Sequence, residues 1–311
     1  MINAAAQVVA VVGPTAAGKS DLGVALAQAL GGEVVNADSM QLYRGMDIGT
    51  AKLSLAERHG VAHHLLDVWD VRTTATAAAY QQLCRAVIDD LLARGVTPVL
   101  VGGSGLYLRA ALDVMEFPGT DPALRAELEA DLAEHGPEPL HARLTELDAA
   151  AAGRMEPSNG RRIVRALEVV LLTGSMPGAM TAYDAHYRTT YIGLDRPDLA
   201  ERTGLRVDRM WAAGLLDEVA ALTPLGLAEG VTASRALGYA QALKQLDGTW
   251  SQAEAQEHTK VATRRFVKRQ RAWFGRDPRI TWLQPEAEPE PGPGPDRPGS
   301  TVLARALALL A

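Results

Sequence analysis

Only one cysteine, Cys84, occurs among the 311 residues, so an intramolecular disulfide framework is excluded. A single thiol is typical of proteins that fold in a reducing cytoplasm. The sequence also lacks a positively charged, cleavable leader, and it lacks an apolar run near the roughly 18 residues that span a bilayer. These absences predict a cytoplasmic protein that has no membrane as a partner.

Positive charge is not in excess either. Lys and Arg number 31 against 37 Asp and Glu, which gives a formal net charge of −6. Such a balance argues against a histone-like binder, although a local basic patch can still bind a polyanion. The hydrophobic content of 47% and the charged content of 22% are ordinary for a globular protein. At this length the chain can form one large domain with an insertion, or two domains.

Short β-branched runs alternate with helical patterns along the first hundred residues. Strands are predicted at 7–12, 33–36 and 97–101, and helices at 19–30 and 76–94. The first run is continuously apolar, as expected for a strand buried on both faces. This alternation predicts a parallel sheet with right-handed crossovers, whose ligands lie at the carboxyl ends of the strands. The loops that follow these ends, at 13–20, 37–41 and 102–105, should converge on one crevice.

The remainder of the chain is mostly helical in pattern. Residues 116–187 carry Ala, Leu, Glu and Arg at helical spacing, which we interpret as a helical insertion domain. A strand at 190–194 returns the chain to the sheet, and helices follow at 198–223 and 251–274. The core domain is therefore expected to comprise 1–115 and 188–283. A disordered, Pro/Gly-rich linker is predicted at 284–299 and a short tail helix at 300–311.

A Gly-rich turn directly after the first predicted strand matches the phosphate-binding pattern G-x-x-x-x-G-K-[ST] and opens a helix. Its residues are Gly13, Pro14, Thr15, Ala16, Ala17, Gly18, Lys19 and Ser20. Backbone N–H groups of such a turn surround phosphate oxygens, and the helix N-terminus adds partial positive charge. Lys19 supplies a cation, and the Ser20 hydroxyl is placed to bind Mg²⁺. The motif predicts an α/β fold with a P-loop NTPase-like parallel sheet flanked by helices, but leaves the phosphate compound open.

Polar side chains gather just past the second predicted strand. Asp38 brings a carboxylate, Ser39 a hydroxyl and Gln41 an amide, in a loop that faces the phosphate loop in the predicted topology. The carboxylate could hold Mg²⁺ through water or act as a general base. The alternative is that Asp38 caps a helix that begins at Ser39.

Two segments concentrate positive charge. Between residues 258 and 276 there are basic and aromatic residues but no acid; the basic residues are Lys260, Arg264, Arg265, Lys268, Arg269, Arg271 and Arg276. Either these residues contact RNA phosphates, which predicts salt-dependent binding, or the helix is solvated and its aromatics pack on the core. Arg161, Arg162 and Arg165 open another predicted helix, with Ser158 or Asn159 as the N-cap. Three arginines oppose the helix dipole there, which suggests a purpose other than helix stability.

Several motifs in order resemble the tRNA dimethylallyltransferase family. The phosphate loop and the following segment ADSMQLYRGMDIGTAK match its opening, and the resemblance spans about 270 residues, outside the Pro-rich tail. Further matches are HHLLD from His63, VGGSGLYL from Val101, RRIVRALEV from Arg161, SRALGY from Ser234 and TRRFVKRQRAWF from Thr263.

The resemblance implies prenyl transfer from dimethylallyl diphosphate to the adenosine just 3′ of the anticodon of a tRNA, with Mg²⁺ as cofactor. The loop 13–20 would hold the diphosphate instead of ATP, and Asp38 would take a proton from the exocyclic amine. Catalytic roles are implied for Asp38, Ser104, Lys19 and Arg235. Contacts with tRNA are implied for Asp38, Ser39, Met40, Gln41, Arg125, Arg161, Arg162, Arg165, Arg235, Arg264, Arg265, Lys268 and Arg269. We expect a monomer that binds the anticodon stem-loop.

The sequence departs from the family pattern at three places. Ser104 and Ser20 stand where family members often carry threonine, and both keep the hydroxyl. Asn159 replaces the aspartate usual before the Arg-rich helix. Asparagine can still cap a helix but cannot accept a salt bridge, which puts any tRNA or interdomain role there in doubt.

Other functions fit parts of the sequence. A small-molecule P-loop kinase would use the same loop for ATP but would not need the basic segments. An adenylate isopentenyltransferase would prenylate free AMP, without need of the helical insertion. A non-catalytic RNA-binding protein would leave Asp38 without a purpose. We expect no zinc site at His63 and His64, which lack ligands at suitable spacing, and we expect Cys84 in the core.

Overall fold

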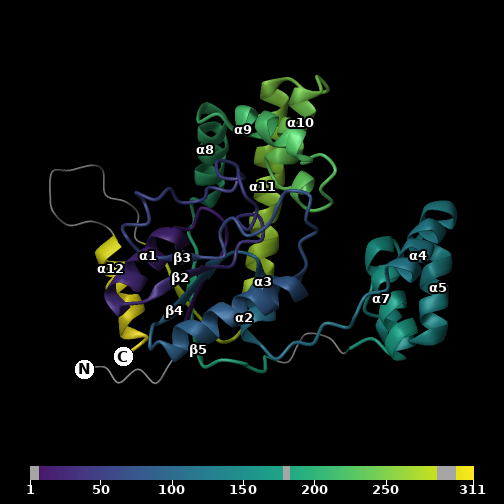
Figure 1. Cartoon of the computed structure of the whole chain (residues 1–311), viewed down its shortest axis with the longest axis horizontal. Coiled ribbons are helices and arrows are strands. Elements are labelled where there is room, and N and C mark those ends of the chain that lie inside the picture. Colours follow the sequence, from purple (N-terminus) through teal and green to yellow (C-terminus); the bar gives the residue numbers. More distant parts are fainter. Residues whose placement is uncertain (1–6, 178–182, 286–298) are drawn as a thin grey trace. The chain divides into compact units, whose positions relative to one another are not determined.

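A computed structural model of the chain describes residues 7–177, 183–285 and 299–311. The chain divides into two compact units (Figure 1). The first comprises Met1–Asp113 and Ala185–Ala311, and the second comprises Val114–Asp184. Among the described residues, no helix combines the length and apolar character needed to cross a membrane.

The first unit contains a six-stranded parallel sheet in the order β3-β2-β4-β1-β5-β6. Its strands are β1 (Val8–Val12), β2 (Glu33–Asn36), β3 (His63–His64), β4 (Pro98–Gly102), β5 (Thr189–Leu194) and β6 (Ile280–Leu283). In register, Val12 of β1 pairs with Gly102 of β4 and with Gly193 of β5. The three loops after β1, β2 and β4 therefore leave the sheet at the same edge, as the sequence predicted.

Both faces of the sheet are covered, which explains why β1 is apolar at every position. Val8, Ala10 and Val12 belong to one buried cluster, with α2 (Ala77–Ala93) and α3 (Gly105–Leu112). Val9 and Val11 belong to the opposite cluster, with α1 (Lys19–Leu30) and α12 (Gly299–Ala308). Alternating side chains of a strand point to opposite faces, so a doubly covered strand needs apolar residues throughout.

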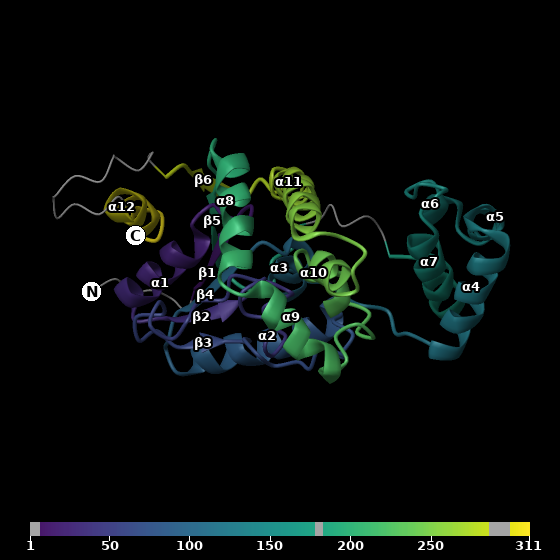
Figure 2. The ribbon, with the colours of Figure 1, turned by 90° about the horizontal axis from the view of Figure 1, so that it is seen from above.

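A separate helical layer adjoins the strands. It consists of α8 (Leu199–Ala212), α9 (Leu215–Leu222), α10 (Tyr239–Leu246), α11 (Gln252–Phe274) and the 3₁₀ turns Thr223–Leu225 and Ala233–Arg235. Its core includes Trp211, Val219 and Tyr239, together with Tyr43 and Met46 from the segment after β2. Figure 2 shows α11 running beside α8. The layer therefore packs on the loop that carries Asp38 and its neighbours.

The second unit is a small helical bundle. It contains α4 (Pro122–His135), α5 (Pro137–Leu147), α6 (Ala149–Ala152) and α7 (Gly160–Thr173). Leu128, Leu140, Leu144 and Leu167 are buried in its core. Asn159 caps α7, because its side-chain oxygen accepts a hydrogen bond from the Arg162 N–H at 3.3 Å.

The structure differs from the sequence prediction in several elements. The helix predicted at 198–223 is broken into α8 and α9 at Gly214, whose φ of +97° cannot continue a right-handed helix. The helical unit covers 114–184 instead of 116–187, since Asp113 pairs with Ala185 where the chain re-enters the core. The short strands β3 and β6 and the helices α3 and α10 were not predicted. Of the linker predicted at 284–299, residues 286–298 lie outside the described residues.

Candidate active site

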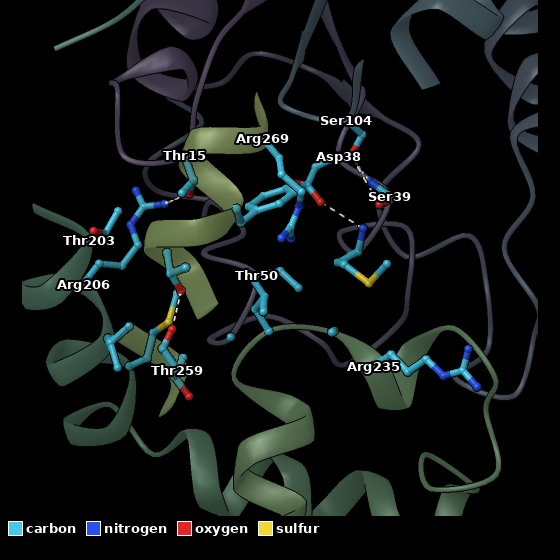
Figure 3. A pocket seen from close by; sticks show the side chains of 18 residues that line it. Thr15, Asp38, Ser39, Thr50, Ser104, Thr203, Arg206, Arg235, Thr259 and Arg269 are labelled. Atoms are coloured by element: carbon cyan, nitrogen blue, oxygen red, sulfur yellow. Dashed lines mark hydrogen bonds between the residues drawn. The ribbon is translucent and has the colours of Figure 1, made fainter. Parts of the chain in front are cut away.

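Two adjoining cavities occupy the carboxyl edge of the sheet, and Figure 3 shows the larger of them. The larger has a volume of about 290 Å³, and the smaller about 80 Å³. Thr15, Asp38, Thr50 and Arg206 line both of them. Lys19 and Ser20 line the smaller cavity, whereas Ser39, Met40, Ser104, Arg235 and Arg269 line the larger. The predicted convergence of loops on one crevice is therefore what the fold produces.

The phosphate loop has the strained backbone that its glycines suggest. Gly13 has a φ of +134°, and a Cβ there would lie 2.2 Å from the carbonyl oxygen of Leu194. Gly18 (φ +95°) caps α1, and even Ala16 has a φ of +66°. The loop therefore wraps over the end of β5 and delivers its N–H groups to the start of α1, the usual geometry for binding phosphate.

Two arginines from α8 reach this loop. Arg206 donates from Nη1 to the Thr15 hydroxyl at 3.2 Å, and Arg202 donates from Nε to the Ala16 carbonyl oxygen at 3.2 Å. Lys19 folds back and donates to the Pro14 carbonyl oxygen at 2.7 Å. The loop thus carries one cation of its own and is buttressed by two others from a helix about 190 residues further along the chain.

Lys19 and Arg206, the cations of the smaller cavity, are buried without enough neighbouring negative charge to offset the loss of water. Burial lowers the pKa of the Lys19 ammonium to about 8, the nearby Asp38 raises it, and Arg206 lowers it further. Burial also lowers the pKa of Arg206, with a further contribution from Arg202, while Asp21 and Asp38 oppose the shift. A pair of cations whose charged forms are both disfavoured is stabilised by a bound anion. The electrostatics therefore favour a phosphate-bearing ligand at this end of the crevice.

This shift predicts how anion binding depends on pH. An anion binds protonated Lys19 more tightly, and Lys19 loses its proton in the free protein above a pH of about 8. Below that pH, Lys19 stays protonated and the affinity for inorganic diphosphate should not change on its account. Above it, the affinity should fall by up to about tenfold for each pH unit. Calorimetric titration between pH 7 and 9.5 measures this. Lys19→Met, the control, should bind weakly without that decline; an equally steep decline in the variant would contradict the assignment.

Asp38 lies at the junction of the two cavities and is held by its own loop. Its Oδ1 accepts a hydrogen bond from the Met40 N–H at 2.9 Å, and the Asn36 side chain bonds both its N–H and its carbonyl oxygen. Its Oδ2 has no hydrogen-bond partner among the described residues, and Figure 3 shows the carboxylate beside the cavity. No helix begins at Ser39, so the alternative that Asp38 is a helix cap is wrong.

The neighbours of Asp38 are fixed to the surrounding loops. The Ser104 hydroxyl accepts from the Ser39 N–H at 3.2 Å and lies 3.3 Å from the Ser39 hydroxyl. The Gln41 amide donates to the Thr50 carbonyl oxygen at 3.1 Å. Met40 lines the larger cavity, and Gln41 the smaller. Serine in place of the usual threonine at 104 therefore still supplies the bonding oxygen.

The basic residues of α11 differ in their surroundings. Arg269 lines the larger cavity, with its guanidinium 5.6 Å from the centroid of the Phe266 ring. Arg264 pairs with Glu257 at 3.2 Å, while Arg265 and Lys268 are exposed. Arg235 lines the larger cavity but is exposed, and in Figure 3 its guanidinium points away from Asp38. The structure thus brings Arg269 and Arg235 to the rim of the larger cavity, where both are exposed, and leaves Arg264, Arg265 and Lys268 on the surface.

The arginines of the helical unit fall into two kinds. Arg161 and Arg162 are exposed on the first turn of α7. Arg125 and Arg165 instead bond the carboxylate of Glu168, which is fully buried. Arg165 also donates to the carbonyl oxygens of Pro118 at 2.7 Å and Gly119 at 3.1 Å. A buried carboxylate needs such partners, so these two arginines have a structural task that the sequence did not reveal.

His63, His64 and Cys84 have three different surroundings. His63 lines the smaller cavity, and burial lowers the pKa of its ring; His64 bonds Glu33 at 2.5 Å. No group of three or more His, Cys, Asp or Glu side chains in the described part of the chain could hold a metal. Cys84 is buried in the core, as predicted, and burial raises the pKa of its thiol to about 12.

Three sets of residues at the site carry no recognisable motif in the sequence. Arg202 and Arg206 stand in an ordinary helical pattern, and Gln270 is hidden among arginines. Glu218 accepts hydrogen bonds from the Ile48 N–H at 2.8 Å and from the Tyr239 hydroxyl at 2.5 Å, and so holds the loop before Thr50. The only signal was spacing: Arg202 and Arg206 are four apart and share one helix face.

Comparison with known sequences identifies close relatives. The family model described as IPP transferase matches residues 41–277. The tRNA dimethylallyltransferase of Streptomyces coelicolor is 63% identical over 286 residues, which cover 90% of this chain and 90% of that protein. The tRNA dimethylallyltransferase of Salinispora tropica is 59% identical over 310 residues, which cover 99% of this chain and 93% of that protein.

Solved structures show the same fold. A tRNA isopentenylpyrophosphate transferase of Bacillus halodurans superposes with a TM-score of 0.70 at 37% identity, over 98% of this chain and 96% of that one. A eukaryotic dimethylallyltransferase, solved acting on tRNA, superposes with a TM-score of 0.76 at 26% identity, over 90% of this chain and 74% of that one. A phosphate loop, a carboxylate beside it and this degree of similarity lead to one conclusion: the chain belongs to the IPP transferase family.

Proposed function

We propose that the protein transfers a dimethylallyl group from dimethylallyl diphosphate to the exocyclic amine of the adenosine 3′-adjacent to the anticodon in tRNA, and releases diphosphate. One observation carries the proposal. Asp38 borders both a smaller cavity that contains Lys19 and a larger cavity whose lining includes Val207, Met210, Leu237 and Phe266, and Arg206 lines both cavities. A diphosphate and a hydrocarbon chain can therefore lie on either side of one carboxylate.

The larger cavity suits a hydrocarbon even though five threonines line it, three of them on helices α8 and α11. The hydroxyl of Thr203 bonds the Leu199 carbonyl oxygen at 2.7 Å. The hydroxyls of Thr259 and Thr263 likewise bond the carbonyl oxygens four residues earlier in α11, each at 2.8 Å. Because these hydroxyls are satisfied within their own helices, the cavity gains little polarity from them. Val207, Met210, Leu237 and Phe266 supply apolar surface to the same cavity.

Asp38 is suited to accept the proton of the reaction. The amine nitrogen forms a bond to the allylic carbon while the carbon–oxygen bond to diphosphate breaks, and diphosphate leaves with the electron pair. The amine becomes acidic only as its new bond forms, so a carboxylate within reach can take the proton late. The Oδ1 of Asp38 is held by the Met40 N–H, which leaves Oδ2 for this task.

The leaving diphosphate gains negative charge as the bond breaks. The loop N–H groups, Lys19 and Arg206 can stabilise that charge. The proposal includes Mg²⁺ bound with the diphosphate. The donors present fit this ion: Ser20 lines the smaller cavity and offers its hydroxyl oxygen, Asp38 would reach the ion only through water, and waters and the diphosphate oxygens would be the remaining ligands. When bound, Mg²⁺ would neutralise charge on the leaving group.

The exposed basic side chains are proposed to bind tRNA phosphates. This group includes Arg161 and Arg162 in the helical unit and Arg265, Lys268 and Arg269 on α11. Ser39, Met40 and Gln41 would line the pocket for the extruded adenine, and Arg235 would approach the RNA from the surface. A single-stranded anticodon loop makes extrusion of the base less costly than a duplex would. We also propose that the enzyme acts as a monomer in the cytoplasm.

The two kinds of arginine in the helical unit should respond differently to mutation. Arg161→Ala and Arg162→Ala are expected to weaken tRNA binding about 3- to 10-fold each and to reduce its salt dependence, without changing the melting temperature. Arg165→Ala should lower the melting temperature as well, because it leaves Glu168 with fewer partners. Filter binding over a salt series and thermal melts measure both effects. Equal melting temperatures for all three variants would contradict the structural role of Arg165.

The test of function supplies purified protein with Mg²⁺, labelled dimethylallyl diphosphate and one acceptor at a time. The acceptors are unmodified tRNA, the same tRNA with guanosine replacing the adenosine 3′ of the anticodon, and AMP. Label is expected in the first alone. Label in AMP but not in tRNA would indicate an adenylate isopentenyltransferase. Hydrolysis of ATP without tRNA, and no prenyl transfer, would indicate a kinase.

A further inference from the structure

Gln270 is a buried polar residue with no role in the chemistry above. It lies on α11 between Arg269, which lines the larger cavity, and Arg271, which bonds Asp195 at 2.8 Å. Its relative exposure is only 4%, which is unusual on a helix so rich in charged residues. A buried amide is costly unless both its donor and its acceptor find partners, so the partners of Gln270 are informative.

Both ends of the Gln270 amide bond the site loops. Its Oε1 accepts a hydrogen bond from the Thr15 N–H at 2.9 Å, and its Nε2 donates to the Gly103 carbonyl oxygen at 3.0 Å. The orientation of the amide is therefore unambiguous, because a flipped amide would face a donor with a donor and an acceptor with an acceptor. One side chain of α11 thus joins the phosphate loop to the loop after β4.

The contact with Gly103 is close enough to require glycine. A Cβ at that position would lie 2.3 Å from the Gln270 Nε2 and 3.2 Å from the Gly13 carbonyl oxygen. The glycine before Ser104 is therefore needed to admit the Gln270 amide. The same loop continues to Ser104, whose hydroxyl bonds Ser39 beside Asp38. The contacts of Gln270 accordingly reach both halves of the site.

Thr15 is held from two directions. Its backbone N–H is committed to Gln270 on α11, and its hydroxyl to Arg206 on α8. This N–H is then not available to a bound anion, so the diphosphate must be bound by the N–H groups later in the loop, toward Ser20. The N–H groups near Ser20 can face the anion only if the backbone of the first half of the loop, from Gly13, holds one conformation.

We propose that Gln270 is a positioning residue that sets the anion-binding shape of the 13–20 loop and couples that loop to the basic helix α11. The inference rests on the proposed function only in naming the ligand as a diphosphate. That the ligand is an anion follows from the loop itself. Gln270 lines the smaller cavity, but both ends of its amide are already bonded to the protein. It acts through the Thr15 N–H and the Gly103 carbonyl oxygen.

The test measures anion binding directly, with inorganic diphosphate and Mg²⁺ as the probe in calorimetry. Gln270→Met keeps the volume and loses both hydrogen bonds, and is expected to weaken diphosphate binding about 10-fold. Gln270→Glu keeps an oxygen that accepts from the Thr15 N–H, but its second oxygen cannot donate to the Gly103 carbonyl oxygen and repels it. The substitution also adds a buried negative charge near the bound anion. Its loss should be larger, about 100-fold. The exposed Gln252→Glu on the same helix is the matched control and should bind as the unsubstituted protein does.

Three further readouts separate positioning from a purely structural role. The KM for dimethylallyl diphosphate should rise in parallel with the loss of diphosphate affinity, while tRNA affinity stays within about 2-fold. A purely structural residue would lower the melting temperature and leave the diphosphate affinity of the folded protein unchanged. Diphosphate binding by Gln270→Met equal to that of the unsubstituted protein would overturn the inference.

A double-mutant cycle keeps the proposal testable even where one variant folds poorly. With Gln270 intact, Gly103→Ala should weaken diphosphate binding at least 10-fold, because the new Cβ displaces the Gln270 amide. In a Gln270→Ala background, where the amide is absent, the same change should have a much smaller effect; additive effects would overturn the coupling. The proposed function fails separately, if the unsubstituted protein binds diphosphate but transfers no prenyl group to tRNA. Failure of the unsubstituted protein to bind diphosphate overturns both.

Discussion

Asp38→Asn is expected to reduce the rate constant for prenyl transfer to tRNA by about 10³-fold, within the range for loss of a general base. Asparagine has nearly the same shape, and its oxygen can still accept the hydrogen bond that the Met40 N–H now gives to Oδ1. The loop should therefore keep its conformation. What is lost is the oxygen that accepts the proton of the amine.

Single-turnover kinetics with enzyme in excess over labelled tRNA measure this effect apart from product release. The KM for dimethylallyl diphosphate and the affinity for tRNA should change by no more than about 3-fold, because the interaction is made mainly in the transition state. Asp90→Asn, an exposed carboxylate on α2 that pairs with Arg94 on the surface, is the matched control. Full transfer activity in Asp38→Asn would refute the proton-transfer role, and with it the reaction as described above.

Arg206→Met is expected to lower kcat/KM for dimethylallyl diphosphate by about 10²- to 10³-fold, the usual effect of removing a group that stabilises a developing anion. The guanidinium bonds the Thr15 hydroxyl and lines both cavities. Burial lowers its pKa, so its charge is poorly stabilised until an anion binds. Removing it should therefore cost binding energy and catalysis, but little stability.

Arg206→Lys should recover only part of the loss, since an ammonium cannot bond the hydroxyl and the phosphate in the planar manner of a guanidinium. Arg209→Met is the matched control, because Arg209 is exposed on the same helix α8. Steady-state kinetics at saturating tRNA provide the measurement, with circular dichroism melts to compare stability. A melting temperature that falls in step with activity would show that Arg206 is mainly structural.

Local chemistry made part of this site predictable. Residues 13–20 form a motif whose glycines permit the backbone geometry of a phosphate loop. Continuous apolar runs identified β1 and β4, because both faces of those strands are buried. Parallel strands place their following loops at one edge, so the meeting of Lys19, Asp38 and Ser104 followed from topology. The two-residue strand β3 had no such pattern, because so short a strand gives no periodicity.

Basic residues were the least predictable group. Their charge was evident, but charge alone does not tell whether a carboxylate from elsewhere in the chain will meet it. Arg165 and Arg125 meet the buried Glu168, and Arg264 meets Glu257, while Arg269 turns toward the cavity. The Arg125–Glu168 pair joins α4 to α7, so it depends on how separate helices pack. The Arg165–Glu168 and Arg264–Glu257 pairs each lie within one helix, where spacing allows the pair but does not decide whether it forms.

The sequence by itself determined the anion-binding loop, the carboxylate next to it, the central parallel strands and the family resemblance, because each is encoded by residues that are close in the chain or by periodic burial. Only the tertiary structure decided which distant side chains complete the site. Arg206 and Gln270 reach Thr15 across 191 and 255 residues, and Glu218 holds the loop before Thr50. The physical reason is that such contacts form only after the helices have docked on the sheet, where packing sets which polar groups meet.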